Sequence, residues 1–284
     1  MALATIASPP PGLDHLSADR FARLSELIYA ETGIKMPRTK ATMLEGRLRR
    51  RVRDTDTRTL DGYVDLLLAD PHANGEIDHL INAVTTNKTD FFREPGHFDF
   101  LADTVLPTIA AEGQRRIRAW SAACSTGAEP YTMAMILDRF AQTSGVDYGI
   151  LATDIDTDVL ETARRGIYPA EMVEPVPSVL RQRYVLGSRD RRAAQVRIAP
   201  ALRAAIGFAR LNLMDTHYPI GAAMDVIFCR NVLIYFDKPT QEKVVRRLCD
   251  CLRPGGYLFL GHSETIAGMD LPVKTVSYTV FERC

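Results

Sequence analysis

The sequence predicts an α/β protein in which a small all-helical domain is followed by a doubly wound, mainly parallel sheet. Two observations lead to this prediction. Up to about residue 85, apolar residues recur at helical spacing, and no stretch alternates as a strand does. From about residue 115, short apolar strands alternate with helices of roughly 10–15 residues, which favours an open parallel sheet with helices on both faces.

The helical domain is predicted to span residues 1–84. Its first 14 residues are rich in proline and are expected to form a loose tail. Helical segments then follow at about 17–34, 39–53, 59–68 and 75–84. In the second of these segments, Leu44, Leu48 and Val52 share one face, which predicts that this face packs into the domain.

A linker at residues 85–95 is predicted to join the helical domain to a sheet domain at residues 96–284. The expected strands are 117–121, 148–153, 225–229, 257–261 and 273–281, and the expected helices are 130–140, 157–165 and 239–252. Residues 167–210 interrupt this alternation with proline-rich and charged stretches and two short strand candidates, 195–198 and 206–211. The interruption predicts a small β subdomain inserted between units of the sheet.

Composition argues against several classes of protein. The 35 basic residues balance the 35 acidic ones, so no global basic field is available to attract nucleic acid. No apolar run approaches the roughly 18 residues that span a bilayer, and the N-terminus lacks the pattern of a signal peptide. We therefore expect a cytoplasmic protein that neither binds nucleic acid nor inserts into membranes.

The cysteines and histidines give no sign of a metal site. Five cysteines are too few and too scattered for a disulfide framework in a chain of 284 residues. Cys249 and Cys251 lie two apart on a predicted helix, where they do not face each other. The six histidines contain no His-x-x-x-His pair. The sequence therefore predicts that no metal is bound.

Residues at the ends of the first two predicted strands indicate a nucleoside site, because ligands of open α/β sheets bind outside the carboxyl ends of the strands. The first strand runs into a turn of small residues at 121–131, and the second ends at Asp154. A carboxylate there is placed to accept both hydroxyls of a ribose, and Glu129 could meet the amino group of a methionine-like tail. The dinucleotide fingerprint is absent. On this pattern alone, a plain tight turn with a helix-capping aspartate remains an alternative.

Five blocks of sequence resemble, in order and spacing, the chemotaxis receptor methyltransferases of the CheR family. They are the linker motif 82–94, the cofactor turn 125–131, the Asp-Ile-Asp at 154–156, the segment 228–236 and the Gly-His-Ser-Glu at 261–264. The similarity covers residues from about 17 to 282. One departure is Ala128, where the family usually has an acidic residue. Glu129, the position expected to touch the cofactor, is retained.

The resemblance implies a class I methyltransferase-like fold that uses S-adenosyl-L-methionine, releases S-adenosyl-L-homocysteine, and methylates glutamate side chains of chemotaxis receptors to glutamyl methyl esters. The cofactor contacts that it implies are Asn87, Thr89, Arg93, Glu129, Asp154, Asn212, Leu213, Arg230 and Asn231. It also implies that Arg93 and Tyr235 position the substrate carboxylate. A glutamate with a pKa of about 4.3 is already a nucleophile at neutral pH, so no general base is needed.

Alternatives remain for these residues and for the function. Arg93 could form a salt bridge between domains, and Tyr235 could be a core residue with a satisfied hydroxyl. A methyltransferase for another substrate would share the sheet but not the helical domain and linker. A non-enzymatic cofactor-binding regulator would show a broken site, whereas all the implied residues are present.

The predicted helix at about 39–53 is strongly basic. Its arginines include Arg47, Arg49, Arg50 and Arg53, and most are expected to point outward. The resemblance implies that this helix meets acidic surface on chemoreceptor cytoplasmic domains, although a merely solvated face is an alternative. It further implies that the β subdomain could dock a receptor tether peptide. We expect the protein to be a monomer.

Overall fold

The computed structural model describes residues 14–72, 75–188, 190 and 194–284, so the loose tail expected at 1–14 lies, except for its last residue, outside the described residues. The chain divides into two compact units, Met1–Thr86 and Asn87–Cys284. They are named here the helical unit and the sheet unit.

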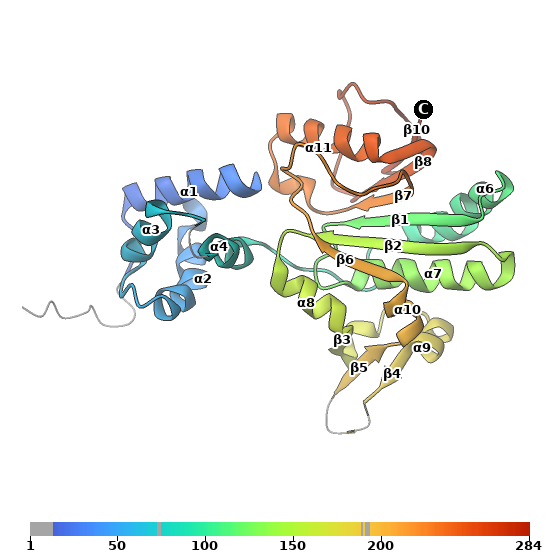
Figure 1. The fold of residues 1–284 in the computed structure, drawn as a ribbon, viewed down its shortest axis with the longest axis horizontal. Coiled ribbons are helices and arrows are strands. Elements are labelled where there is room, and N and C mark those ends of the chain that lie inside the picture. Colours follow the sequence, from blue (N-terminus) through green and yellow to red (C-terminus); the bar gives the residue numbers. More distant parts are fainter. Residues whose placement is uncertain (1–13, 73–74, 189, 191–193) are drawn as a thin grey trace, which may run out of the picture. The chain divides into compact units, whose positions relative to one another are not determined.

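The helical unit contains α1 (Ala18–Thr32), the short 3-10 helix η1 (Arg38–Lys40), α2 (Ala41–Asp54), α3 (Leu60–Ala69) and α4 (Glu76–Val84) (Figure 1). The hydroxyl of Ser17 accepts a hydrogen bond from the backbone of Arg20 and so begins α1, and Gly33 ends it in the left-handed conformation. The residues that fill the core recur at helical spacing, and they include Leu24, Ile28, Leu44, Leu48, Tyr63, Leu67 and Leu80. The predicted all-helical N-terminal domain is confirmed.

The sheet unit is built on a seven-stranded sheet with the order β6-β2-β1-β7-β8-β10-β9. The strands are β1 (Arg116–Ala122), β2 (Asp147–Asp154), β6 (Ile206–Arg210), β7 (Met224–Cys229), β8 (Leu252–Leu260), β9 (Val273–Ser277) and β10 (Val280–Arg283). The first five of these are parallel, and β10 pairs antiparallel with both β8 and β9. This is the predicted doubly wound, mainly parallel sheet.

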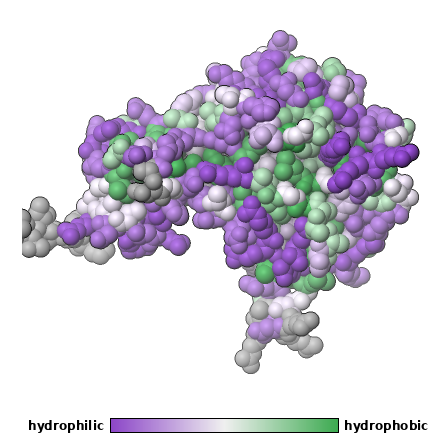
Figure 2. All heavy atoms as spheres, in the orientation of Figure 1, coloured by the Kyte–Doolittle hydropathy of each residue, from purple (hydrophilic) through white to green (hydrophobic). Residues whose placement is uncertain are grey.

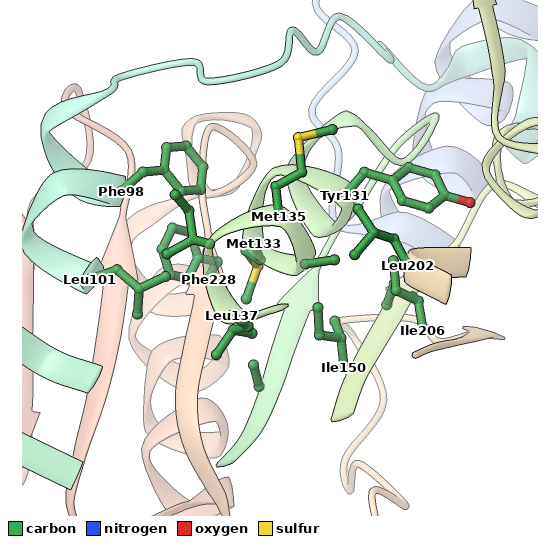
Figure 3. Close-up of a cluster of buried hydrophobic side chains, with 14 of the residues drawn as sticks. Phe98, Leu101, Tyr131, Met133, Met135, Leu137, Ile150, Leu202, Ile206 and Phe228 are labelled. Carbon is green, nitrogen blue, oxygen red and sulfur yellow. The ribbon is translucent and has the colours of Figure 1, made fainter. Parts of the chain in front are cut away.

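Both faces of the sheet are buried, as β1 illustrates. Ile117 and Ala119 belong to one apolar cluster, and Trp120 and Ala122 belong to another. Successive side chains of a strand point to opposite faces, so a strand with a core on each side needs apolar residues at both sets of positions. The first cluster (Figure 3) packs the sheet against the helical stretch α5 (Gly96–Phe100), η2 (Leu101–Val105) and α6 (Leu106–Ala111) and against α7 (Ala128–Ser144). The second packs it against α11 (Lys238–Cys251).

After β2, the chain forms α8 (Thr157–Arg165) and then a separate three-stranded antiparallel sheet in the order β3-β5-β4. The remaining elements here are β3 (Ile167–Pro169), η3 (Ala170–Val173), α9 (Ser178–Tyr184), β4 (Val185–Gly187), β5 (Gln195–Ile198) and α10 (Pro200–Ala204). The insertion was expected to run to about residue 210. However, β6 pairs in parallel with β2 and belongs to the large sheet. As an edge strand β6 is mostly solvated, so its sequence does not distinguish it from a strand of a small sheet.

Within the described part of the chain, no helix is long and apolar enough to cross a membrane. Figure 2 shows hydrophilic residues over much of the face in view, with apolar residues gathered on the sheet unit.

Candidate active site

The carboxyl ends of the five parallel strands meet at one edge of the sheet, and most of the predicted site residues directly follow them. The turn 123–127 follows β1, Asp154 is the last residue of β2, and Asn212 lies two residues beyond β6. Arg230 and Asn231 follow β7, and Gly261 follows β8. In open α/β folds, this edge is where ligands bind.

Asp154 is buried and organises the turn after β1. One of its carboxylate oxygens accepts a hydrogen bond from the Ser125 backbone N–H at 2.8 Å, and the other accepts one from the Asp156 N–H at 3.0 Å. Burial raises the pKa of Asp154 to about 6, although these backbone hydrogen bonds lower it. The helix-capping role that was an alternative for Asp154 belongs instead to Asp156, which accepts from the first N–H groups of α8.

The turn after β1 has an unusual backbone. Ala123, Ser125 and Gly127 all have positive φ, with Gly127 at 94°. At Gly127 a Cβ atom would lie 2.8 Å from the Ala163 Cβ and 2.9 Å from the Tyr168 hydroxyl, so no larger residue fits. This turn therefore brings the backbone close to its neighbours at the point where the nucleoside was predicted.

Asn87 reaches this turn from the start of the sheet unit. Its side-chain amide donates a hydrogen bond to the Asp156 carboxylate at 2.7 Å, and its backbone carbonyl accepts one from the Ser125 hydroxyl at 2.9 Å. These contacts bring Asn87 together with the turn that Asp154 organises, and its role toward the cofactor stays a prediction.

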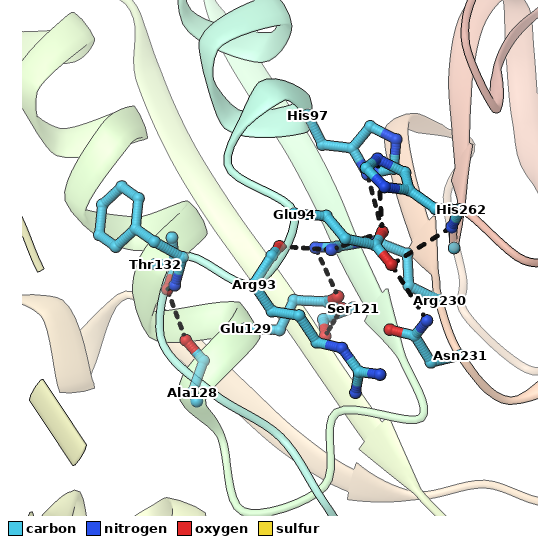
Figure 4. Close-up of polar contacts among 12 residues, drawn as sticks. Arg93, Glu94, His97, Ser121, Ala128, Glu129, Thr132, Arg230, Asn231 and His262 are labelled. Atoms are coloured by element: carbon cyan, nitrogen blue, oxygen red, sulfur yellow. Dashed lines mark hydrogen bonds and ion pairs between the residues drawn. The ribbon is translucent and has the colours of Figure 1, made fainter. Parts of the chain in front are cut away.

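A second group of polar residues surrounds Arg230, which is almost fully buried (Figure 4). Its guanidinium donates to the Glu94 carboxylate at 2.9 Å, to the Glu129 carboxylate at 3.4 Å and to the carbonyl of Arg93. Glu129 also accepts from the Ser121 hydroxyl at 2.7 Å. Burial raises the pKa of Glu129, while Arg230 opposes the rise. Burial also acts to raise the pKa of Glu94, but Arg230 and Asn231 outweigh it and leave that pKa below its usual value.

Glu264 ties the ends of β7 and β8 together. Its carboxylate accepts four backbone hydrogen bonds of 2.6 to 2.9 Å, from Asn231, Val232, Leu233 and Gly261. Asn231 has a positive φ of 59°, and a Cβ atom on Gly261 would lie 2.6 Å from the Asn231 side chain. Glu264 therefore fixes the turn that carries Arg230 and Asn231.

The structure places the other predicted residues less tightly. The guanidinium of half-buried Arg93 donates to the Lys88 carbonyl at 3.1 Å. Tyr235 packs against the second apolar cluster, and within the described residues its hydroxyl makes no hydrogen bond. The Asn212 side chain accepts from the Met214 N–H at 2.9 Å, and Leu213 is buried. Thr89 is half-buried, and among the residues that the structure describes no hydrogen bond of its side chain reaches the Asp154 or Arg230 groups.

Sequence reasoning gave no role to Glu94, His97, His262 or Glu264. Glu94, His262 and Glu264 lie inside the blocks that carry the family resemblance, so their presence was visible but their partners were not. His97 lies outside those blocks. Glu94 pairs with Arg230 across 136 positions, and nothing in the local spacing reveals such a contact.

The basic helix α2 is less outward than expected. Arg47 donates to the carbonyls of residues 83, 84 and 85 at 3.3, 3.0 and 2.7 Å, at the end of α4. Arg51 forms a two-pronged ion pair with Glu76 at 2.9 and 2.8 Å. Two arginines of α2 do face solvent, Arg50 with a side chain that is 82% exposed, and Arg53. Arg49 is half-buried and donates a hydrogen bond to the backbone carbonyl of Asp14. Long side chains from the flank of a helix reach neighbouring elements, which explains the difference.

The comparisons with known proteins agree with this geometry. The family description "CheR methyltransferase, SAM binding domain" matches residues 87–281, and "CheR methyltransferase, all-alpha domain" matches residues 19–85. The chain is 39% identical over 267 residues to chemotaxis protein methyltransferase 2 of Pseudomonas aeruginosa, covering 94% of each chain. It is 40% identical over 266 residues to the chemotaxis protein methyltransferase of Escherichia coli, covering 94% of this chain and 91% of that one.

A third relative is the chemotaxis protein methyltransferase of Klebsiella aerogenes, which is 42% identical over 281 residues and covers 99% of this chain and 93% of its own. Fold, strand-end site and family matches together define an S-adenosylmethionine-dependent methyltransferase. More specifically, the chain belongs to the CheR methyltransferase family.

Proposed function

We propose that this protein transfers the methyl group of S-adenosylmethionine to glutamate side chains of chemotaxis receptors and so forms glutamyl methyl esters. The observation that carries the proposal is a pair of carboxylates at the carboxyl edge of the sheet, buried Asp154 and the partly buried Glu129. Glu129 shares its partner Arg230 with Glu94, the residue that follows Arg93 in the chain. The names of the relatives, all chemotaxis protein methyltransferases, support the choice of substrate.

The cofactor is assigned to the turn after β1. Asp154, with a pKa near 6, is largely ionised at pH 7 and can accept both ribose hydroxyls. Glu129 receives the amino group of the methionine moiety, and Arg230, which donates to this carboxylate at 3.4 Å, orients it. Asn212 and Leu213 flank the adenine. The remaining cofactor contacts in this assignment are Asn87, Thr89, Arg93 and Asn231.

The reaction needs alignment more than acid–base chemistry. A glutamate carboxylate oxygen attacks the methyl carbon, and the electron pair of the carbon–sulfur bond goes to the sulfur, which leaves as the neutral thioether of S-adenosylhomocysteine. No proton is transferred, because the nucleophile is already ionised. Holding oxygen, carbon and sulfur in line can lower the barrier by roughly 7–11 kcal/mol. Arg93 and the Tyr235 hydroxyl are assigned to hold the carboxylate, which they must orient without over-stabilising it.

Receptor docking is assigned to the exposed arginines of α2. Arg50 and Arg53 face solvent and Arg49 is half-buried, so these three can meet acidic receptor surface. Arg47 is removed from that assignment, since its guanidinium is held by the carbonyls at the end of α4. The β3-β5-β4 sheet leaves two edge strands, and an extended receptor tether peptide could add to one of them as a further strand. We assign the protein to the cytoplasm, where the cytoplasmic domains of the receptors lie, and we expect it to act as a monomer.

Incubation with radiolabelled S-adenosylmethionine tests the proposal. The substrates are a panel of receptor cytoplasmic domains, with total RNA and cell metabolites as the alternative acceptors. Base-labile label on receptor protein is the expected result. Label on RNA or on a small molecule alone would favour a methyltransferase for another substrate, and cofactor binding with no transfer to any acceptor would favour a regulator.

A further inference from the structure

Three potential metal ligands meet beside Arg230, although the sequence places them up to 168 positions apart. They are Glu94, His97 and His262, and one ligand atom from each lies within 4.8 Å of the other two. The His97 Nδ1 is 3.5 Å and the His262 Nε2 is 3.9 Å from the same Glu94 oxygen, Oε2. Figure 4 shows both imidazole rings directed at this carboxylate.

His97 is a buried ring with one unpartnered nitrogen. Its side chain is 4% exposed, and its Nε2 lies 2.9 Å from the Thr279 hydroxyl. The other nitrogen, Nδ1, makes no hydrogen bond in the described structure, although it is the one that faces Glu94. A buried polar atom without a partner is costly, and an imidazole lone pair beside a carboxylate oxygen is stabilised only if a cation or a proton lies between them.

We propose that Glu94, His97 and His262 form a zinc site. Bonds of about 2.0–2.2 Å to nitrogen and oxygen place tetrahedral ligand atoms about 3.3–3.5 Å apart. The 3.5 Å between His97 and Glu94 already matches this separation. The His262 Nε2 lies 3.9 Å from Glu94, and the ligand atoms of the two histidines lie within 4.8 Å of each other, so His262 must move closer to both, and its 45% exposed side chain leaves it free to do so.

The hydrogen bonds of Glu94 leave room for one further bond. An ionised carboxylate offers about four lone-pair positions. Oε1 accepts from the Asn231 amide and from the His262 backbone N–H, both at 3.2 Å. Oε2 accepts from Arg230 at 2.9 Å. The position that remains lies on Oε2, the atom that both histidines face.

The charges around the cluster tolerate a cation despite the nearness of Arg230. Three carboxylates lie close together here, and both Glu94 and Glu264 act to raise the pKa of Glu129. Arg230 contributes one positive charge beside these three carboxylates. A divalent ion on Glu94 would therefore relieve a local excess of negative charge, provided that Arg230 keeps its contact with Glu129.

The donor set selects the metal. Two imidazole nitrogens and one carboxylate suit zinc and related transition ions, whereas magnesium and calcium prefer oxygen ligands throughout. Three protein ligands also leave a fourth tetrahedral position open to water. The proposed methyl transfer uses no metal, and zinc binding is measured without cofactor or receptor, so the two proposals can fail independently.

Calorimetric titration of the chelator-stripped full chain with zinc chloride tests the site. All proteins carry Cys284→Ser, because Cys284 is an exposed thiol that could bind zinc by itself. The parent should bind one zinc ion, and His262→Gln should bind it at least about tenfold more weakly, as expected when a metal site loses a ligand. His262 is partly exposed, so this variant should fold normally.

His217→Gln is the matched control, because His217 is an exposed histidine of the same unit outside the cluster. It should keep the parent's affinity. Thermal unfolding gives a second measurement: zinc should raise the midpoint of the parent and of His217→Gln but not that of His262→Gln. The proposal is overturned if the parent binds no zinc, or if His262→Gln and His217→Gln bind it equally well.

Discussion

The buried carboxylate of Asp154 should make the protein less stable as the pH rises, and Asp154→Asn should remove that effect. The pKa of Asp154 is raised from 3.8 to about 6 in the folded protein. The folded state therefore holds its proton more tightly than the unfolded state does. The contribution of this proton to the stability of the folded protein is fully present below pH 3.8 and is lost as the pH rises through about 6.

The size of this effect follows from the two pKa values. The rise of the pKa from 3.8 to about 6 corresponds to about 3 kcal/mol at pH 8, where the group is ionised in both states. At pH 5, where the folded-state group is mostly protonated, only about half of that loss has occurred. Between pH 5 and pH 8, the stability of Asp154→Asn relative to the parent should thus rise by roughly 1–2 kcal/mol. The asparagine also changes the hydrogen bonds to the backbone of Ser125 and Asp156, but that change does not depend on pH.

Urea unfolding of the parent and Asp154→Asn at pH 5, 6, 7 and 8 measures this slope. The same variant, and Asp154→Ala, should bind S-adenosylhomocysteine more weakly by roughly 1.5–3 kcal/mol, because the ribose hydroxyls lose a charged acceptor. A difference in stability that stays constant with pH would refute the assigned ionisation. An unchanged affinity in calorimetry would refute the ribose contact.

Three further predictions concern arginines. Arg93→Ala should reduce the rate of receptor methylation far more than the free energy of unfolding; methylation at the parent rate would rule out a positioning role. Changing Arg49, Arg50 and Arg53 together to Glu should abolish receptor methylation while leaving cofactor affinity intact, because repulsion then replaces attraction between the two proteins. Methylation by the parent should also fall as salt is added, since the Debye length shrinks to about 3 Å at 1 M. Normal methylation by the triple variant at low salt would show that these arginines form only a solvated face. Arg47→Ala should lower the free energy of unfolding, measured in urea, by roughly 1–2 kcal/mol, because carbonyls at the end of α4 lose their hydrogen-bond donor. A change below about 0.5 kcal/mol, as expected for a plain surface site, would contradict this capping role.

Local patterns were sufficient to predict the sheet and the strand-end residues. Asp154 and the turn before Glu129 lie at positions that the alternation of strands and helices fixes, so their convergence on one edge could be expected. The edge strand β6 was assigned to the insertion because a solvated strand reads the same in a large sheet as in a small one.

Contacts between residues distant in sequence could not be predicted. Arg230 was expected near the cofactor, but its pairing with Glu94 depends on how the segment before α5 crosses the end of β7. Glu264 lies in a recognisable block, yet its four backbone partners come from two different strand ends. The Glu94, His97 and His262 cluster could not be predicted from spacing, because the fold assembles it from two separate segments.

The chemical nature of the methylated group tests the central claim most directly. Receptor cytoplasmic domains treated with the protein and S-adenosylmethionine would be digested and sequenced by mass spectrometry, before and after mild base. We predict methyl groups on glutamate side chains that are lost with base, and their absence when Asp154→Ala replaces the parent at low cofactor concentration. Methyl groups that withstand base, or that lie on lysine, arginine or asparagine, would contradict the proposed function.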